Sequence, residues 1–177
     1  TDGRFLQDLA RRVAMRTESK APARPPELLA YLTDEIGPSL AKLGFEFRVF
    51  DNPVADAPPL LVAQRIEGAD LPTILAYGHG DVVQGHEGQW RRGAGPWALT
   101  VEGDRVFGRG TSDNKGQHSV LIASLAAILE TRGHLGFNLK ILLEMAEEVG
   151  SIGLEQFCRH NRELLDADLF IGTDGPR

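Results

Sequence analysis

Apolar runs with the length of β-strands alternate along this chain with stretches whose apolar residues recur at helical spacing. The strand-like runs are expected at 45–50, 60–66, 73–79, 137–145 and 167–174. The helical pattern is expected at 4–16, 27–43, 115–130 and 152–165. Such alternation predicts an α/β domain with three layers, in which helices cover both faces of a mixed, largely parallel sheet.

The bulk composition suits one globular domain and narrows the choice of partners. Of the 177 residues, 42% are hydrophobic, which is enough for a core, and the net charge is −6. The negative charge and scattered basic residues disfavour nucleic acid or an anionic membrane as the main partner. The single cysteine, Cys158, excludes an internal disulfide, and no run approaches the roughly 18 apolar residues of a membrane span. The amphipathic start does not resemble a signal peptide, so a cytoplasmic protein is expected.

Polar residues stand where several of the apolar runs end. His79 and Asp81 come at the end of the run 73–79, Glu147 and Glu148 follow the next long run, and Asp174 closes the last one. In open α/β sheets, ligand-binding groups cluster where strands end. These side chains are therefore the first candidates for a functional site.

Taken one at a time, these residues also fit structural roles. A His at a strand end is a common metal ligand whose other ring N–H Asp81 could accept, although an isolated His-x-Asp is more often a hydrogen-bonded turn. Asp113 precedes the helix predicted at 115–130, so it could bridge two cations or cap that helix. Asp174, in Asp-Gly-Pro, could be a ligand or part of an ordinary turn.

The adjacent carboxylates of Glu147 and Glu148 should repel one another, and each is costly to bury unpaired. A divalent cation relieves both problems if one Glu is a ligand and its neighbour acts as a base toward water. The alternative is a solvated helix start, where the helix dipole favours acidic residues.

Together, one imidazole and several carboxylates predict a metal site. This mixture of ligands suits zinc, manganese or cobalt, and the single cysteine argues against a thiolate site. Competing motifs are weaker, because the glycines around Arg109 lack the order of a phosphate loop and Ser112 lacks a GxSxG setting. His118 and the remaining histidines are interpreted as surface or packing residues.

The segments GHGDVV, GRGTSDNKG and EEVGSIGL, with Trp90 between the first two, resemble the M20 family of dinuclear metallopeptidases. The match runs in family order from about Ile74 to Asp174. The family includes dipeptidases, carboxypeptidases and N-acyl amino acid deacylases. The resemblance implies a catalytic domain of the zinc-peptidase type, and a cis peptide bond between Asp113 and Asn114.

The resemblance also implies a role for each candidate residue. Two divalent ions are expected, zinc first, with cobalt or manganese as alternatives. By position, the roles are a first-metal imidazole ligand at His79, an orienting carboxylate at Asp81, a bridging ligand at Asp113, a general base at Glu147, a second-metal ligand at Glu148 and a further first-metal ligand at Asp174. Asp81 and Glu147 are thus the catalytic candidates and the other four are the metal ligands.

An Asp at position 174 is commoner among dipeptidases and aminopeptidases of the family, so short peptides are the expected substrates. The expected activity is hydrolysis of an amide or peptide bond in a small substrate. Two alternatives stay open. One is an N-acyl amino acid deacylase of the acetylornithine deacetylase or succinyl-diaminopimelate desuccinylase type, and the other is a catalytically incompetent metal-binding fragment.

The chain departs from the family pattern in its extent. The family takes a distal His near its C-terminus for the second metal and inserts a smaller domain for dimerisation and substrate binding, whereas this chain stops at Arg177. The resemblance therefore implies that residues 1–177 are the N-terminal portion of a truncated catalytic domain. The lid domain and C-terminal catalytic segment would be absent, and the full-length protein would be a homodimer.

Overall fold

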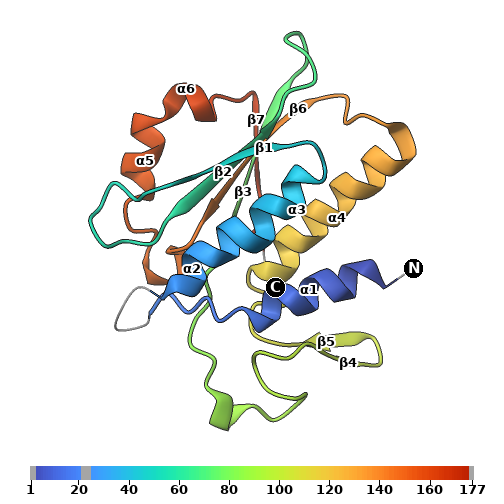
Figure 1. Cartoon of the computed structure of the whole chain (residues 1–177), viewed down its shortest axis with the longest axis vertical. Helices are drawn as coiled ribbons and strands as arrows, with labels where there is room; N and C mark the ends of the chain where they lie inside the picture. Colours follow the sequence, from blue (N-terminus) through green and yellow to red (C-terminus); the bar gives the residue numbers. More distant parts are fainter. Residues whose placement is uncertain (1–2, 21–24, 176–177) are drawn as a thin grey trace.

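A five-stranded sheet forms the centre of the computed structural model, which describes residues 3–20 and 25–175 (Figure 1). The end of the expected domain, at Arg177, lies outside the described residues. The sheet order is β1-β2-β6-β3-β7. The strands are β1 (Glu46–Phe50), β2 (Leu60–Arg65), β3 (Thr73–His79), β6 (Asn138–Glu144) and β7 (Leu169–Gly172). Since β2 is antiparallel to both neighbours and the other pairings are parallel, β2 alone is reversed and the expected mixed, largely parallel sheet is confirmed.

Helices cover both faces of the sheet, as the three-layer prediction requires (Figure 1). One face carries α1 (Arg4–Ala14), α2 (Pro26–Ala30), the π-helix η1 (Tyr31–Ile36), α3 (Gly37–Ala41) and α4 (Lys115–Arg132). The other carries α5 (Leu154–His160) and α6 (Arg162–Leu165).

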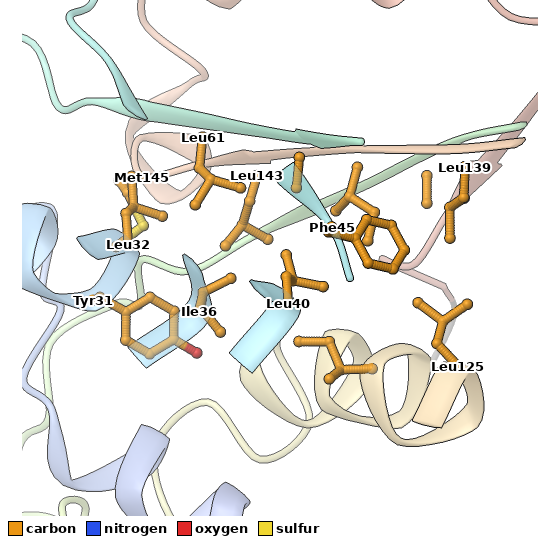
Figure 2. Close-up of a cluster of buried hydrophobic side chains, with 14 of the residues drawn as sticks. Tyr31, Leu32, Ile36, Leu40, Phe45, Leu61, Leu125, Leu139, Leu143 and Met145 are labelled. Carbon is orange, nitrogen blue, oxygen red and sulfur yellow. The ribbon is translucent and has the colours of Figure 1, made fainter. Parts of the chain in front are cut away.

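The two cores follow the strand period of two residues. On β2, Leu61 and Ala63 join the larger core under the first helical layer, part of which is drawn in Figure 2. Their neighbours Leu60 and Val62 point the other way and pack with Phe157 of α5. Both faces of the central strands β2 and β6 are therefore packed against apolar side chains.

The helix predicted at 27–43 is interrupted by the π-helical segment Tyr31–Ile36, which ends two residues before Pro38. Proline has no N–H to donate to the carbonyl of residue 34, and its ring would clash with that carbonyl. Wider π-turns are a known way of relieving such a conflict within a helix. The disturbance at Pro38 thus takes the form of a change in helix type.

The long connection from β3 to α4 contains the short helix η2 (Glu87–Gln89) and a hairpin of β4 (Thr100–Glu102) and β5 (Arg105–Phe107). Two tryptophans brace it: the indole N–H of Trp90 donates to the Gly85 carbonyl, and that of Trp97 donates to Glu87. A Cβ at Gly85 would lie 2.5 Å from the Trp97 ring, so any larger residue there would force that ring to move. No helix in the described part of the chain is long and apolar enough to cross a membrane.

Candidate metal centre

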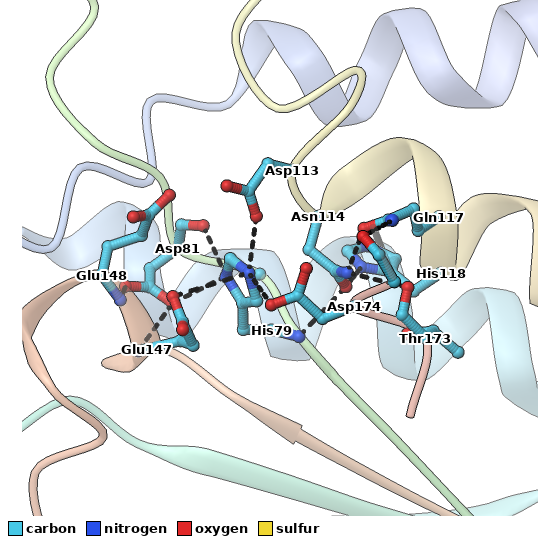
Figure 3. A network of polar contacts seen from close by, with 12 residues as sticks. His79, Asp81, Asp113, Asn114, Gln117, His118, Glu147, Glu148, Thr173 and Asp174 are labelled. Atoms are coloured by element: carbon cyan, nitrogen blue, oxygen red, sulfur yellow. Dashed lines mark hydrogen bonds and ion pairs between the residues drawn. The ribbon is translucent and has the colours of Figure 1, made fainter. Parts of the chain in front are cut away.

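The candidate residues meet where the parallel strands β3, β6 and β7 end. The register pairs His79 of β3 with Glu144 of β6, and Tyr77 of β3 with Gly172 of β7. The acidic pair therefore emerges beside His79 through the short helix η3 (Glu147–Val149), and the end of β7 arrives on the other side. Figure 3 shows the side chains converging on the His79 imidazole.

The imidazole of His79 is fully buried and held on both sides. Its Nδ1 lies 3.0 Å from the carbonyl oxygen and 3.3 Å from the Oδ1 of Asp81, so Nδ1 carries a proton and donates. Its Nε2 faces carboxylate oxygens of three other residues: Asp113 at 2.9 Å, Asp174 at 3.7 Å and Glu147 at 3.8 Å. The Nε2 position is thus surrounded by negative charge.

The carboxylates around His79 raise the pKa of its imidazole. Burial lowers it, but the hydrogen bond and charge of Asp81, together with the charge of Glu147, outweigh burial and raise the pKa above its usual value. The pKa of Glu148 is also raised, first by burial and then by the charges of Asp81 and Glu147, although His79 opposes the shift. The cluster therefore favours added positive charge, whether as a proton or as a cation.

The donor set fits a divalent metal. One ligand atom from each of His79, Glu147 and Asp174 lies within 4.8 Å of the others. One imidazole nitrogen with carboxylate oxygens is a set that zinc, manganese and cobalt all accept. This trio includes Glu147, which the resemblance makes a base, and leaves out Asp113 and Glu148. The ligand roles of His79, Asp113, Glu148 and Asp174 therefore stay predictions.

Asp81 does more than contact the imidazole. Its buried carboxylate accepts the backbone N–H of Glu147 on Oδ1 at 3.2 Å and that of Glu148 on Oδ2 at 3.1 Å. One side chain thus joins the histidine to the acidic pair, across 66 and 67 positions of sequence. The pattern of residues gives no local signal for this contact.

Asp113 occupies the loop before α4, where capping was the alternative. The residue in the N-cap position is Asn114, whose side chain makes no capping hydrogen bond. The Asp113 carboxylate contacts Nε2 of His79. The peptide bond between Asp113 and Asn114 is cis, as the resemblance predicted.

Glu144 is a buried carboxylate near the site that sequence reasoning left inside an apolar run. It is 1% exposed and accepts the hydroxyls of Tyr77 and Ser151. Burial raises its pKa and the Asp81 charge adds to this, while the two hydroxyls oppose it. A charged residue close to the end of a long apolar run was the signal available in the sequence.

Comparison with known proteins agrees with this fold. Residues 75–176 match the peptidase family M20/M25/M40, so the chain belongs to that family and the predicted resemblance is confirmed. Beta-Ala-His dipeptidase of Mus musculus is 29% identical over 171 residues, which are 90% of this chain and 34% of that protein. Succinyl-diaminopimelate desuccinylase of Methylobacterium radiotolerans is 33% identical over 170 residues, which are 92% of this chain and 40% of that protein.

Two solved structures resemble the whole fold. Human carnosine dipeptidase 1 has a TM-score of 0.89 at 27% identity, with 98% of this chain and 38% of that chain covered. The M20 family metallo-carboxypeptidase Sso-CP2 of Sulfolobus solfataricus has a TM-score of 0.81 at 27% identity, with 96% and 37% covered. This chain thus spans 34% to 40% of the length of these four proteins.

Proposed function

We propose that this chain provides the metal centre of a hydrolase that cleaves an amide or peptide bond in a small, dipeptide-like substrate. The observation that carries the proposal is the convergence of His79 Nε2 with carboxylate oxygens of Glu147 and Asp174 within 4.8 Å at the strand ends. Membership of a peptidase family supports the same reaction class.

His79 and Asp174 would hold one divalent ion, Glu148 would hold a second, and Asp113 would bridge them. Zinc is the first choice, with cobalt or manganese as alternatives. Ions bound there would supply Lewis-acid chemistry, acidifying water and polarising the scissile carbonyl.

Glu147 is the proposed general base. Its side chain is 34% exposed, so a carboxylate oxygen can receive a proton from water and later deliver that proton to the leaving amine. Asp81 orients both His79 and the acidic pair. It fixes the tautomer of His79 and accepts the backbone N–H groups of Glu147 and Glu148. The chain's own residues thus supply the proton transfer and the orientation.

We further propose that residues 1–177 form the N-terminal portion of a catalytic domain, a proposal supported by the shares of the relatives covered. Activity is therefore proposed for the full-length protein and should be assayed there. A dipeptidase should cleave a dipeptide carrying a free amino group faster than an N-succinyl amino acid. Because one relative is a desuccinylase, the reverse preference would favour the deacylase alternative.

Metal binding by this chain is the direct test. The chain would be stripped with chelator, reloaded with zinc and washed, and its metal content measured by elemental analysis. A content near two ions per chain supports the dinuclear centre. A content near one supports a single site at His79 and Asp174, with catalysis requiring further residues. No retained zinc would overturn the metal-centre proposal.

A further inference from the structure

Asn114 lies behind the metal centre and joins the ends of two strands. Its side chain is fully buried, and its Oδ1 accepts the backbone N–H of His79 at 3.2 Å. Its Nδ2 donates to the backbone carbonyl of Thr173 at 3.2 Å, one residue before Asp174. Since a backbone N–H can only donate and a carbonyl can only accept, these contacts fix which end of the amide faces each strand. Asn114 thereby connects the backbone of His79, a candidate ligand on β3, with the backbone of Thr173, which precedes the candidate ligand Asp174.

The backbone of β3 leaves room for this side chain. A Cβ at Gly78 would lie 2.8 Å from Asn114 Oδ1 and 2.7 Å from Thr173 Oγ1. Contacts under 3.0 Å would force one of these groups to move, so a glycine next to His79 permits the close approach. This is a packing requirement of the Asn114 bridge.

His118 holds the Asn114 amide in place from one turn further along α4 (Figure 3). It is 3% exposed, and its Nδ1 lies 3.3 Å from the same Oδ1 of Asn114. An amide oxygen carries no proton, so Nδ1 must be the donor. The other ring nitrogen, Nε2, then accepts the hydroxyl of Tyr31 at 2.7 Å. Burial, with the charge of Arg12 next, lowers the pKa of His118 well below its usual value, so the ring is neutral and its only N–H is committed.

We propose that Asn114 and His118 are positioning residues of the metal centre, with His118 orienting the Asn114 amide that aligns the ends of β3 and β7. The inference rests on the proposed function, because its consequence is tighter metal binding by His79 and Asp174. It assigns His118 a role beyond the surface or packing position that its sequence context indicated. Neither residue touches the metal or the substrate in this scheme.

Two substitutions of one residue separate this role from simple packing. In His118→Asn, the amide nitrogen stands where Nδ1 was and can still donate to Asn114. In His118→Gln, the amide stands where Nε2 was, so the contact with Tyr31 can remain while the Asn114 contact is lost. Both replace a buried ring by a smaller amide, so both should lower the melting temperature.

Zinc affinity and hydrogen exchange of the His79 amide would be measured on the same 177-residue chain, the latter by NMR without metal. We expect His118→Gln to weaken zinc binding about tenfold, as loss of an orienting partner typically does, and to speed exchange at His79. His118→Asn should stay close to the parent in both readouts. Tyr31→Phe, which removes the other hydrogen bond of the same ring, should lower stability and leave zinc affinity unchanged.

Equal zinc affinity and equal His79 exchange in the Asn and Gln variants would overturn the inference. If the parent bound no zinc, the proposed function would fail, and the exchange of the His79 amide would still decide whether His118 positions that strand end. If His118→Gln did not fold, the Tyr31→Phe variant would decide. The Asn114 contact would have no specific role if Tyr31→Phe lowered the free energy of zinc binding by as much as it lowered the free energy of unfolding.

Discussion

Both ends of the sheet carry carboxylates, but the groups that surround these carboxylates are of opposite kinds. At the end away from the metal centre, Glu67 accepts the backbone N–H groups of Leu135 and Gly136 at 2.9 Å and pairs with Arg65 at 2.9 Å. At the other end, Asp113, Glu147 and Asp174 all face one imidazole nitrogen. The donors around Glu67 neutralise its negative charge within the fold, whereas the carboxylates around His79 bring several negative charges together.

The pKa values follow this difference. Burial raises the pKa of Glu67, but the two amides and Arg65 lower it to about 2. Burial and neighbouring carboxylates raise the pKa of Glu148. The same kind of side chain thus stabilises the fold at one end and favours an added cation at the other, which is the electrostatic signature of a functional site.

The largest effect is expected for Glu147→Gln in the full-length protein. Removal of the general base should lower kcat for a dipeptide by about 10²- to 10⁴-fold. The metal-free 177-residue chain should be no less stable, because one of several converging negative charges is gone. Steady-state kinetics and denaturant unfolding would test both parts. Retained activity would contradict the assigned base.

Zinc should stabilise the chain through the metal centre alone. At a free zinc concentration about 100 times its Kd, the free energy of unfolding should rise by about 2.7 kcal/mol. Glu67→Gln, at the opposite end of the sheet, should show the same increment, whereas His79→Ala should show none. Urea unfolding with zinc and with chelator would measure it, and an increment that survives in His79→Ala would place the ion elsewhere.

Glu67→Gln should itself cost about 2 kcal/mol of stability at neutral pH, because two backbone N–H groups and Arg65 lose a charged acceptor. The folded-state pKa of about 2 lies below the usual 4.5, so this contribution is fully present above pH 4.5 and is lost as the pH falls toward 2. Urea unfolding between pH 7 and pH 3 would follow the loss. The exposed Glu46 is the matched control, since Glu46→Gln should change stability by no more than about 0.5 kcal/mol.

The smallest effect, of opposite sign, is expected for Glu148 in the metal-free chain. Its folded-state pKa is raised above 4.5, so the folded state loses stability as the pH rises from 4.5 through that pKa. Glu148→Gln should therefore stabilise the chain more at pH 7 than at pH 4. The comparison needs chelator throughout, and an advantage that is larger at pH 4 would show that the carboxylate is neutralised within the fold.

Local patterns predicted most of the framework and the members of the candidate site. The apolar runs around β3 and β6 are long and bounded, so their strands were expected to within about two residues. The pattern could not show the Asp81 contacts to the acidic pair, because they depend on the register between β3 and β6. His118 was interpreted as a surface or packing residue, since Tyr31 reaches its ring only after α4 docks on the first helical layer.

Asp174 follows the least supported strand of the sheet. β7 has four residues, all exposed, and within the described chain it pairs only with β3. In the 177-residue chain by itself, such a strand is expected to fray. An ion shared by His79 and Asp174 would act as a cross-link between the two strands, so fraying of β7 would release the ion and loss of the ion would loosen β7. Pairing of β7 with β3 and binding of the ion would then be one coupled equilibrium.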